Sequence, residues 1–309
     1  MPSKCKKHKI FVFGCLLWDI ICRPNKNFNI GEDTAGLITE RPGGVAFNIA
    51  VELANKLDKD FFTVHLVSIT GKSFQTEIQL NELKKSGINT KHLTIIGNDI
   101  DKYVSIETES GEIFCSVNSC NVFSLNESIV CNQLFKILEN LRKETTESTF
   151  IFDGNLSKSF FDTVINEPQP DKLQNYFIPA NFKKLNVFSH NPLYFNGFSL
   201  LLNLKEAIKL CGKEFDDSYQ ACNYFFNLKN SAFVSIVITD GANIACGIKK
   251  EGLFMLKPKK LDDKPSTSGA GDLFFANYIA SNLLNPDGSV EEYLKYANKH
   301  TYKFLNKRK

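Results

Sequence analysis

The chain of 309 residues is long enough for one large α/β domain, and its 43% hydrophobic and 23% charged residues are typical of a globular protein. The net charge of +3 is small, and no basic helix with interleaved aromatic residues supports nucleic-acid binding. The basic runs Lys4–Lys9 and Lys307–Lys309 are more typical of solvated ends. Nine cysteines without a C-x-x-C pair exclude the usual zinc patterns and favour free thiols in the cytoplasm.

The N-terminal segment has two features of a signal peptide, because basic residues precede the apolar run IFVFGCLLW (10–18). A buried first strand explains the run better, since Trp18-Asp19 follows it without a small-residue cleavage site. The run is also too short to span a bilayer, and no other apolar run is long enough. We therefore expect a cytoplasmic protein with no membrane partner.

Short apolar runs alternate with longer amphipathic segments, which predicts a mainly parallel sheet covered by helices. In chain order the predicted strands are Ile10–Phe13, Val64–Ile69, Thr149–Phe152, Leu185–Phe188 and Val234–Thr239. Apolar residues three or four positions apart predict helices at Val45–Lys56, Phe74–Ser86, Glu127–Arg142, Ser199–Leu210, Asp216–Leu228, Ala270–Leu284 and Val290–Leu305.

Two segments interrupt this alternation. Residues 22–41 carry little helical signal. Tyr103–Val117 alternates polar and apolar residues around Ser110-Gly111, which predicts a β-hairpin with one face in water. A hairpin of this kind inserted into an α/β domain would form a lid. Residues 168–179 fit no element, and no repeat or linker divides the chain.

A glycine-rich turn precedes the helix predicted at Ala270–Leu284, in the sequence STSGAGDLFF (266–275). A helix N-terminus offers unpaired N–H groups, and Gly269, Ala270 and Gly271 leave room for a phosphoryl group to approach them. Asp272 in the first turn could accept the proton of an attacking hydroxyl. The pattern therefore predicts phosphoryl transfer to an alcohol. On this motif alone, an aspartate that only complements the helix dipole is the better interpretation.

A second motif, RPGGVAFNIA (41–50), changes that balance. Gly43 and Gly44 would let the backbone approach a polyhydroxylated ligand, and Asn48 offers both a donor and an acceptor. Asp19 follows the first strand, where open α/β sheets bind their ligands. Three such features at strand ends or helix starts indicate one binding site.

At these residues the chain resembles the ribokinase-like (PfkB) carbohydrate kinases, whose signatures are an N-terminal G-G-x-x-x-N and a C-terminal D-T-x-G-A-G-D. The resemblance runs along nearly the whole chain. Within the family, PGGVAFNIA, GEIFCSVNSCNVF and FDGNLS look most like the pseudouridine kinase branch. The resemblance implies a three-layer α/β/α sandwich with a mainly parallel central sheet and a small antiparallel β lid. Residues 1–309 would form a single kinase domain, with the lid at about 20–41 and 100–120.

The resemblance also implies roles for single residues. Asp272 would be the catalytic base, and the anion hole for the γ-phosphate would consist of Gly269, Ala270 and Gly271. The acceptor would be held by Asp19, Gly43, Gly44, Asn48 and Asn118. The nucleotide would be held by Asn191, Thr239, Gly241 and Asn298. ATP would be the donor, and Mg²⁺ would bridge its phosphates mostly through water, so no residue is assigned as a direct metal ligand.

Four departures from the family pattern leave the acceptor and the activity open. The N-x-x-E motif, which orders magnesium and phosphate in the family, is read at NPLY (191–194), with Tyr194 in place of the glutamate. Phe47 replaces the arginine of the pseudouridine-type motif, Ser266 replaces an aspartate, and Ile244 replaces a glycine. These changes are compatible with weaker metal binding, a different acceptor or lost catalysis.

We therefore expect an ATP-dependent kinase of a sugar or nucleoside, above all of pseudouridine, which would yield pseudouridine 5'-phosphate. The second hypothesis is a kinase of a hexose, a phosphosugar or another nucleoside. The third is a non-catalytic nucleoside-binding protein, which would bind ligand without phosphoryl transfer. An apolar face on Tyr103–Val117 would permit a homodimer through the lid, but nothing in the sequence requires one.

Overall fold

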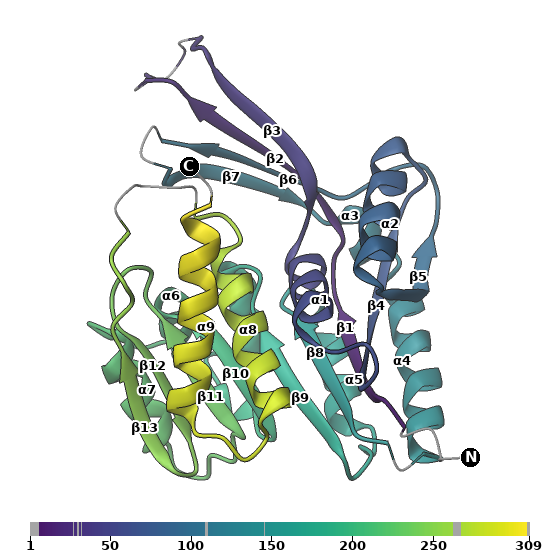
Figure 1. The fold of residues 1–309 in the computed structure, drawn as a ribbon, viewed down its shortest axis with the longest axis vertical. Helices are drawn as coiled ribbons and strands as arrows, with labels where there is room; N and C mark the ends of the chain where they lie inside the picture. Colours follow the sequence, from purple (N-terminus) through teal and green to yellow (C-terminus); the bar gives the residue numbers. More distant parts are fainter. Residues whose placement is uncertain are drawn as a thin grey trace.

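The computed structural model describes residues 6–26, 28–29, 31, 33–108, 111–144, 146–261 and 267–307, and a nine-stranded sheet lies at the centre of this part of the chain (Figure 1). Its strands are β1 (His8–Phe13), β4 (Phe62–Thr70), β5 (Asn89–Ile95), β8 (Ser148–Asp153), β9 (Leu173–Ile178), β10 (Phe198–Asn203), β11 (Ser235–Thr239), β12 (Ala245–Lys249) and β13 (Gly252–Leu256). Their order is β13-β12-β11-β10-β9-β8-β1-β4-β5. All neighbours from β5 to β11 are parallel, whereas β12 and β13 form an antiparallel edge.

Helices cover both faces of the central sheet and so complete three layers (Figure 1). One core lies between the sheet and α1 (Val45–Lys56), α2 (Phe74–Ser86), α8 (Ala270–Leu284) and α9 (Val290–Leu305). The opposite core contains side chains of α3 (Asn121–Leu125), α4 (Glu127–Arg142), α5 (Lys158–Asn166), α6 (Leu204–Cys211), α7 (Ser218–Phe226) and the 3₁₀ segments η1 (Phe182–Phe188) and η2 (Pro192–Phe195). None of the helices in the described part of the chain combines the length and apolarity needed to cross a membrane.

A second sheet projects beyond one edge of the central sheet (Figure 1). Its strands are β2 (Leu17–Pro24), β3 (Gly36–Gly43), β6 (Lys102–Glu107) and β7 (Ile113–Ser119), in the order β3-β2-β6-β7. The pairs β2–β3 and β6–β7 are antiparallel, but β2 and β6 are parallel. The lid is therefore mixed and not purely antiparallel as predicted. Ser110 of the predicted turn lies outside the described residues.

The three-layer α/β fold is confirmed, but β5, β12, β13, α3 and α5 were not predicted, and three predicted segments differ from the observed elements. Ser199–Leu210, predicted as one helix, contains nearly all of β10 followed by most of α6, because the Asn203 side chain caps a new helix there. The predicted strand Leu185–Phe188 belongs to η1. Residues 168–179 contain β9, whose first half carries polar side chains that hide the strand pattern.

Candidate active site

The N-termini of α1 and α8 meet at the edge of the central sheet where the parallel strands end. Gly44 precedes α1 with φ 94° and Gly269 precedes α8 with φ 78°, a left-handed region that glycine enters without strain. The Asn48 side chain of α1 donates a hydrogen bond of 2.8 Å from Nδ2 to Oδ2 of Asp272. A Cβ added at Gly269 would lie 3.6 Å from the same amide nitrogen. The structure thus brings together two motifs that are far apart in the sequence.

The Asp272 carboxyl is partly buried, and burial is the largest influence on its ionisation. Burial raises its pKa from 3.8 to about 6. The hydrogen bond from Asn48 and the positive charge of Arg41 act in the opposite direction, whereas the negative charge of Asp153 adds to the increase. The group is therefore mostly charged at neutral pH but is a stronger base than an exposed aspartate, as general-base catalysis requires.

The N-terminus of α8 is open to an anion. The first intrahelical bond there runs from the N–H of Leu273 to the Gly269 carbonyl at 3.1 Å, so the N–H groups of Gly271 and Asp272 precede it. A Cβ added at Gly271 would meet no heavy atom within 4 Å, which shows free space above this turn. The Ala270 N–H donates to the Thr267 carbonyl at 3.0 Å, so the amides of Gly271 and Asp272, at the positive end of a 15-residue helix, are the ones that an anion could reach.

Four side chains form one row across the lid sheet and face this site. The register pairs Asp19 with Arg41 and with Tyr103, and it pairs Tyr103 with Asn118. Directly paired residues point to the same side of a sheet, so the row Arg41–Asp19–Tyr103–Asn118 lies on one lid face. We call it the acceptor row, after the role predicted for Asp19 and Asn118. The charges of both Asp19 and Asp272 contribute to raising the pKa of Tyr103, after burial as the main cause. A Cβ at Gly43 would overlap the Asp19 carboxylate, which explains that glycine.

A second polar group lies at the ends of β8 and β9. Asp153 is 1% exposed and accepts hydrogen bonds from the backbone N–H groups of Cys15 and Asn155. The Asn155 carbonyl Oδ1 accepts a bond of 2.7 Å from Lys184 Nζ. These residues belong to FDGNLS (152–157), which received no role in the sequence analysis because the partner Lys184 is distant in the chain. The arrangement provides a buried acceptor, Asp153, whose charge acts on Asp272, and a lysine that donates to Asn155.

Cys120 connects this group to the lid. Its Sγ donates to Asn118 Oδ1 at 3.0 Å and lies 3.5 Å from Asn155 Oδ1. Asn118, predicted to contact the acceptor, is therefore in the same small network as Asn155. The eight described cysteines, Cys120 included, are all free.

A complete N-x-x-E motif begins at the end of β10 and was missed in the sequence. Asn203 accepts the N–H of Glu206 at 3.0 Å, and Glu206 Oε2 accepts the N–H of Asn203 at 2.8 Å, which forms a capping box for α6. The Glu206 side chain is buried, and burial together with the charge of Asp272 raises its pKa to about 8. The signal that would have found it is the sequence NLKEA (203–207), which lies inside the run predicted as one helix.

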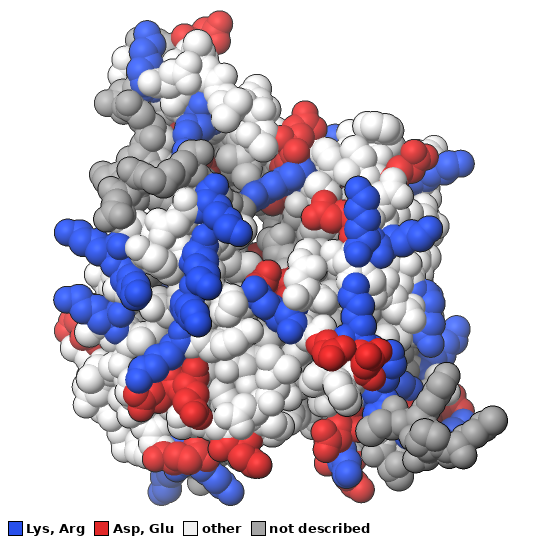
Figure 2. Space-filling model, viewed as in Figure 1, with Lys and Arg blue, Asp and Glu red and all other residues white. Residues whose placement is uncertain are grey.

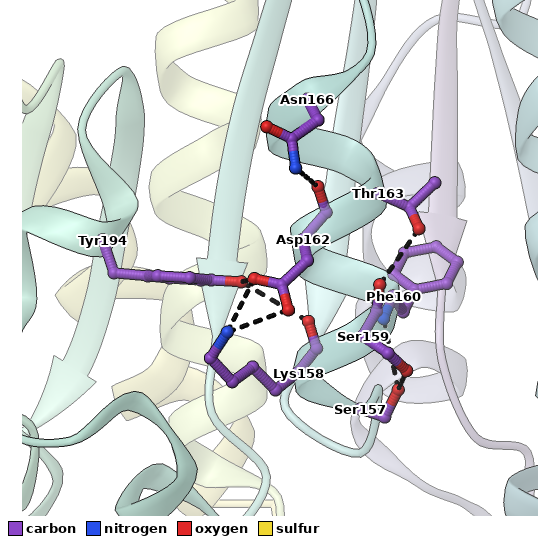
Figure 3. Close-up of polar contacts among 8 residues, drawn as sticks. All are labelled: Ser157, Lys158, Ser159, Phe160, Asp162, Thr163, Asn166 and Tyr194. Carbon is purple, nitrogen blue, oxygen red and sulfur yellow. Dashed lines mark hydrogen bonds and ion pairs between the residues drawn. The ribbon is translucent and has the colours of Figure 1, made fainter.

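Asn191 and Tyr194 do not reach this site, which corrects the interpretation of NPLY as the N-x-x-E motif. They belong to η2 and its cap, before β10 begins, whereas the site lies where β10 ends. A six-residue strand separates the two ends by roughly 17 Å. Tyr194 instead donates a hydrogen bond of 2.7 Å to Asp162 of α5, which Lys158 also contacts (Figure 3). Asn191 accepts the N–H of Leu193 in its own turn.

The other predicted nucleotide residues lie apart from Asp272, on the β11–β13 side. Thr239 ends β11, and Gly241 adopts φ 56° in the turn that follows. Asn298 lies on α9, which packs against β12 and β13. Two departures from the family pattern can be placed: Ile244 is exposed beside this turn, and Phe47 is 3% exposed in the core under α1. Ser266 lies outside the described residues.

Comparisons with known proteins agree with this architecture. A family model described as pfkB family carbohydrate kinase matches residues 7–300. Over 118 residues the chain is 27% identical to pseudouridine kinase from Escherichia coli (strain K12), a match that covers 38% of this chain and only 36% of that kinase. The structure is similar to ribokinase from Giardia lamblia, with a TM-score of 0.75 and 18% identity over 97% of this chain and 94% of that chain. It is also similar to ribokinase from Cryptococcus neoformans var. grubii serotype A in complex with ADP, with a TM-score of 0.70 and 19% identity over 97% and 94%.

The family model covers nearly the whole chain, and the chain therefore belongs to the pfkB family of carbohydrate kinases. The two structural likenesses define the fold as ribokinase-like.

Proposed function

We propose that the chain is an ATP-dependent kinase that phosphorylates a hydroxyl of a nucleoside or sugar, with Asp272 as the catalytic base. The observation that carries this proposal is the position of Asp272 in the first turn of α8, beside the open N–H groups of that turn. Its pKa of about 6 suits proton transfer near neutral pH. Residues 1–309 would act as one kinase domain, with the lid at 20–41 and 100–120.

The transfer step follows from this arrangement. Asp272 takes the proton of the acceptor hydroxyl while its oxygen bonds to the γ-phosphorus of ATP, and the bond from that phosphorus to the β–γ bridging oxygen breaks to release ADP. The charge on the transferred group would be stabilised by the amides of Gly269 and Gly271, whereas the Ala270 amide donates to the Thr267 carbonyl and would have to leave it to take part. The acceptor hydroxyls are oriented by Asp19, Gly43, Gly44, Asn48 and Asn118. The lid that carries Asp19 and Asn118 excludes water, which limits hydrolysis of ATP.

Magnesium fits this site as a partner of the substrate phosphates. In the described part of the chain, no group of three or more His, Cys, Asp or Glu side chains could hold an ion by itself. Mg²⁺ retains several waters and commonly uses one or two carboxylates plus phosphates. Because burial raises the pKa of Glu206 to about 8, Glu206 would release its proton as it and Asn203 hold the hydrated ion, and the ion would neutralise phosphate charge. Thr239, Gly241 and Asn298 would contact the nucleotide, whereas Asn191 stands at the opposite edge of the sheet.

Pseudouridine is the acceptor that we favour. The amides of Asn118 and Asn155 and the Lys184 ammonium group form one polar network at the edge of the acceptor site. A pyrimidine base offers carbonyl and N–H groups to such a network, whereas a simple sugar offers hydroxyls alone. The partial likeness to a pseudouridine kinase supports the same choice.

Initial rates with Mg-ATP and a panel of pseudouridine, uridine, adenosine, ribose and fructose test the acceptor. We expect selective transfer to pseudouridine, and Lys184→Met should reduce that preference more than it reduces the rate with ribose. Transfer to another member of the panel would support the proposed kinase activity and contradict pseudouridine as its acceptor. Nucleotide binding without any transfer would favour a nucleoside-binding protein, against which the intact Asn203–Glu206 motif argues.

We also propose that the outer face of the lid forms a homodimer. One row of paired residues on this face consists of Ile38, Cys22, Ile106 and Cys115. Their side chains point to the side of the lid sheet opposite to that of the acceptor row. Ile38 is 66% exposed and Val117 is 69% exposed, so the face is apolar and uncovered in the single chain. Sedimentation should show a dimer that Val117→Glu converts to a monomer. A wild-type chain that stays monomeric at high concentration would contradict this proposal.

A further inference from the structure

A groove of ≈ 530 Å³ lies between α9 and the segment that follows β13. Its lining is mostly basic: Leu256, Lys257, Lys259, Lys295, Asn298, Lys299, Tyr302 and Lys303. The helical members recur three or four positions apart, so they occupy one face of α9. Side chains of Lys and Arg gather over α9 in Figure 2, while Asp and Glu side chains lie mainly toward its beginning.

The lysines of the groove are poorly neutralised. Lys295, Lys299 and Lys303 follow one another at intervals of four residues, and Lys307 extends the same line. Lys295 pairs with Glu291, and Lys259 lies over the Tyr302 ring at 5.6 Å. Within the described residues, no ion pair joins Lys257, Lys259, Lys299 or Lys303 to a carboxylate. Like charges four positions apart destabilise a helix, so the stripe costs stability unless an anion uses it.

The position of the groove indicates which anion it would bind. β12 is antiparallel to β11, and β13 is antiparallel to β12, so β13 ends at the same edge of the sheet as β11. Leu256 at the end of β13 lines the groove, and Thr239 at the end of β11 is one of the proposed nucleotide contacts. Asn298 belongs to both sets. The groove therefore adjoins the proposed nucleotide site.

We propose that this groove, which we call the lysine groove, is an anion-capture site that draws the nucleoside triphosphate toward the nucleotide site. This inference rests on the proposed kinase function and adds a binding step to it. Clefts lined by one sign of charge raise association rates of charged ligands by about 10–10³-fold, and salt removes the effect. A neutral acceptor gains nothing from the same field. The donor and the acceptor should therefore respond differently to ionic strength.

The test compares two variants that each lose four positive charges. The first replaces Lys257, Lys259, Lys299 and Lys303 by Gln in the lysine groove. The matched control replaces four exposed lysines elsewhere by Gln: Lys84, Lys85, Lys136 and Lys229. Stopped-flow fluorescence with a methylanthraniloyl ATP analogue gives the association rate of each protein. Salt is varied from about 10 mM, where the Debye length is ~30 Å, to about 1 M, where it is ~3 Å.

The wild-type and control rates should fall together by about tenfold or more across this range, whereas the groove variant should start about tenfold lower and change little. The KM for a neutral acceptor should be the same in all three proteins. A groove variant that follows the control at every salt concentration would overturn the capture site. If Asp272-dependent transfer is then still observed, the kinase proposal stands and only this inference fails. A wild-type chain that binds no nucleotide at any salt concentration would contradict both.

Discussion

The Asn48 amide donates a 2.8 Å hydrogen bond to the Asp272 carboxylate and so connects the N-terminal turns of α1 and α8. The bond favours the charged carboxylate, whereas burial and Asp153 favour the neutral form, and the balance leaves the pKa at about 6. Because we propose that Asp272 is the base, we expect Asn48 to shift the pH at which this carboxylate can accept a proton. The pair also explains why the two glycine-rich motifs occur together in one chain.

Removal of the Asn48 amide should shift the pH dependence of transfer. Because that hydrogen bond lowers the pKa of Asp272, Asn48→Ala should move the acid limb of kcat/KM from about pH 6 to a higher pH. The rate should fall as pH drops through the limb in both proteins, since only the charged carboxylate accepts a proton.

Asn277→Ala is a matched control for this shift. Asn277 donates a 2.8 Å hydrogen bond from α8 to Glu52 of α1, but it does not contact Asp272. Its loss should reduce stability and leave the acid limb in place. Identical pH profiles for the wild type and Asn48→Ala would show that the bond does not control the base.

Asp272 should also lower the stability of the folded chain above pH 6. Its folded pKa of about 6 exceeds the ordinary value of 3.8, so folding favours the protonated form. The resulting stabilisation is present below about pH 3.8 and is lost as pH rises through 6. Asp272→Asn should raise the free energy of unfolding by about 1–2 kcal/mol at pH 7 and change it little at pH 4, allowing for partial solvent screening. Urea unfolding at the two pH values measures this difference, and equal effects at both would refute the explanation.

The position of the N-x-x-E motif can be tested by two substitutions. Glu206→Gln should reduce kcat by about tenfold or more and raise the magnesium concentration needed for half-maximal rate, because it removes a buried carboxyl that is coupled in charge to Asp272. Tyr194→Phe removes only the hydrogen bond to Asp162 and should cost about 1 kcal/mol of stability with little effect on transfer. The reverse pattern would restore the interpretation of NPLY as the motif.

Much of this fold could be predicted because local signals coincide with the element ends. The predicted helix α2 has its observed bounds, with a Ser73 cap at the start and Gly87 with φ 79° at the end. The run from Ser199 to Leu210 was wrongly predicted as one helix because buried strand and helix residues are equally apolar. The capping residue Asn203 was the only polar residue that marked the boundary between the strand and the helix. That error also concealed Glu206.

The arrangement of the candidate site could be predicted from the sequence where its residues are neighbours within one motif. The turn before Asp272 is of this kind, since the glycines and the carboxylate are neighbours in sequence. The acceptor row is different, because Arg41, Tyr103 and Asn118 come together only through the register of the lid strands. Lys184 likewise meets Asn155 only after two parallel strands have aligned. Long-range pairings of this type leave no local pattern to read.

The proposal that Asp272 is the catalytic base is tested most directly by two measurements on Asp272→Asn: the rate of single-turnover phosphoryl transfer and the affinity for ATP. The substitution keeps the shape of the side chain and removes its basicity. We predict a loss of at least about 10²-fold in the transfer rate. ATP affinity should be retained or increased, because a negative charge near the phosphates is removed. A variant that transfers phosphate at the wild-type rate would contradict the assignment of Asp272 as the base.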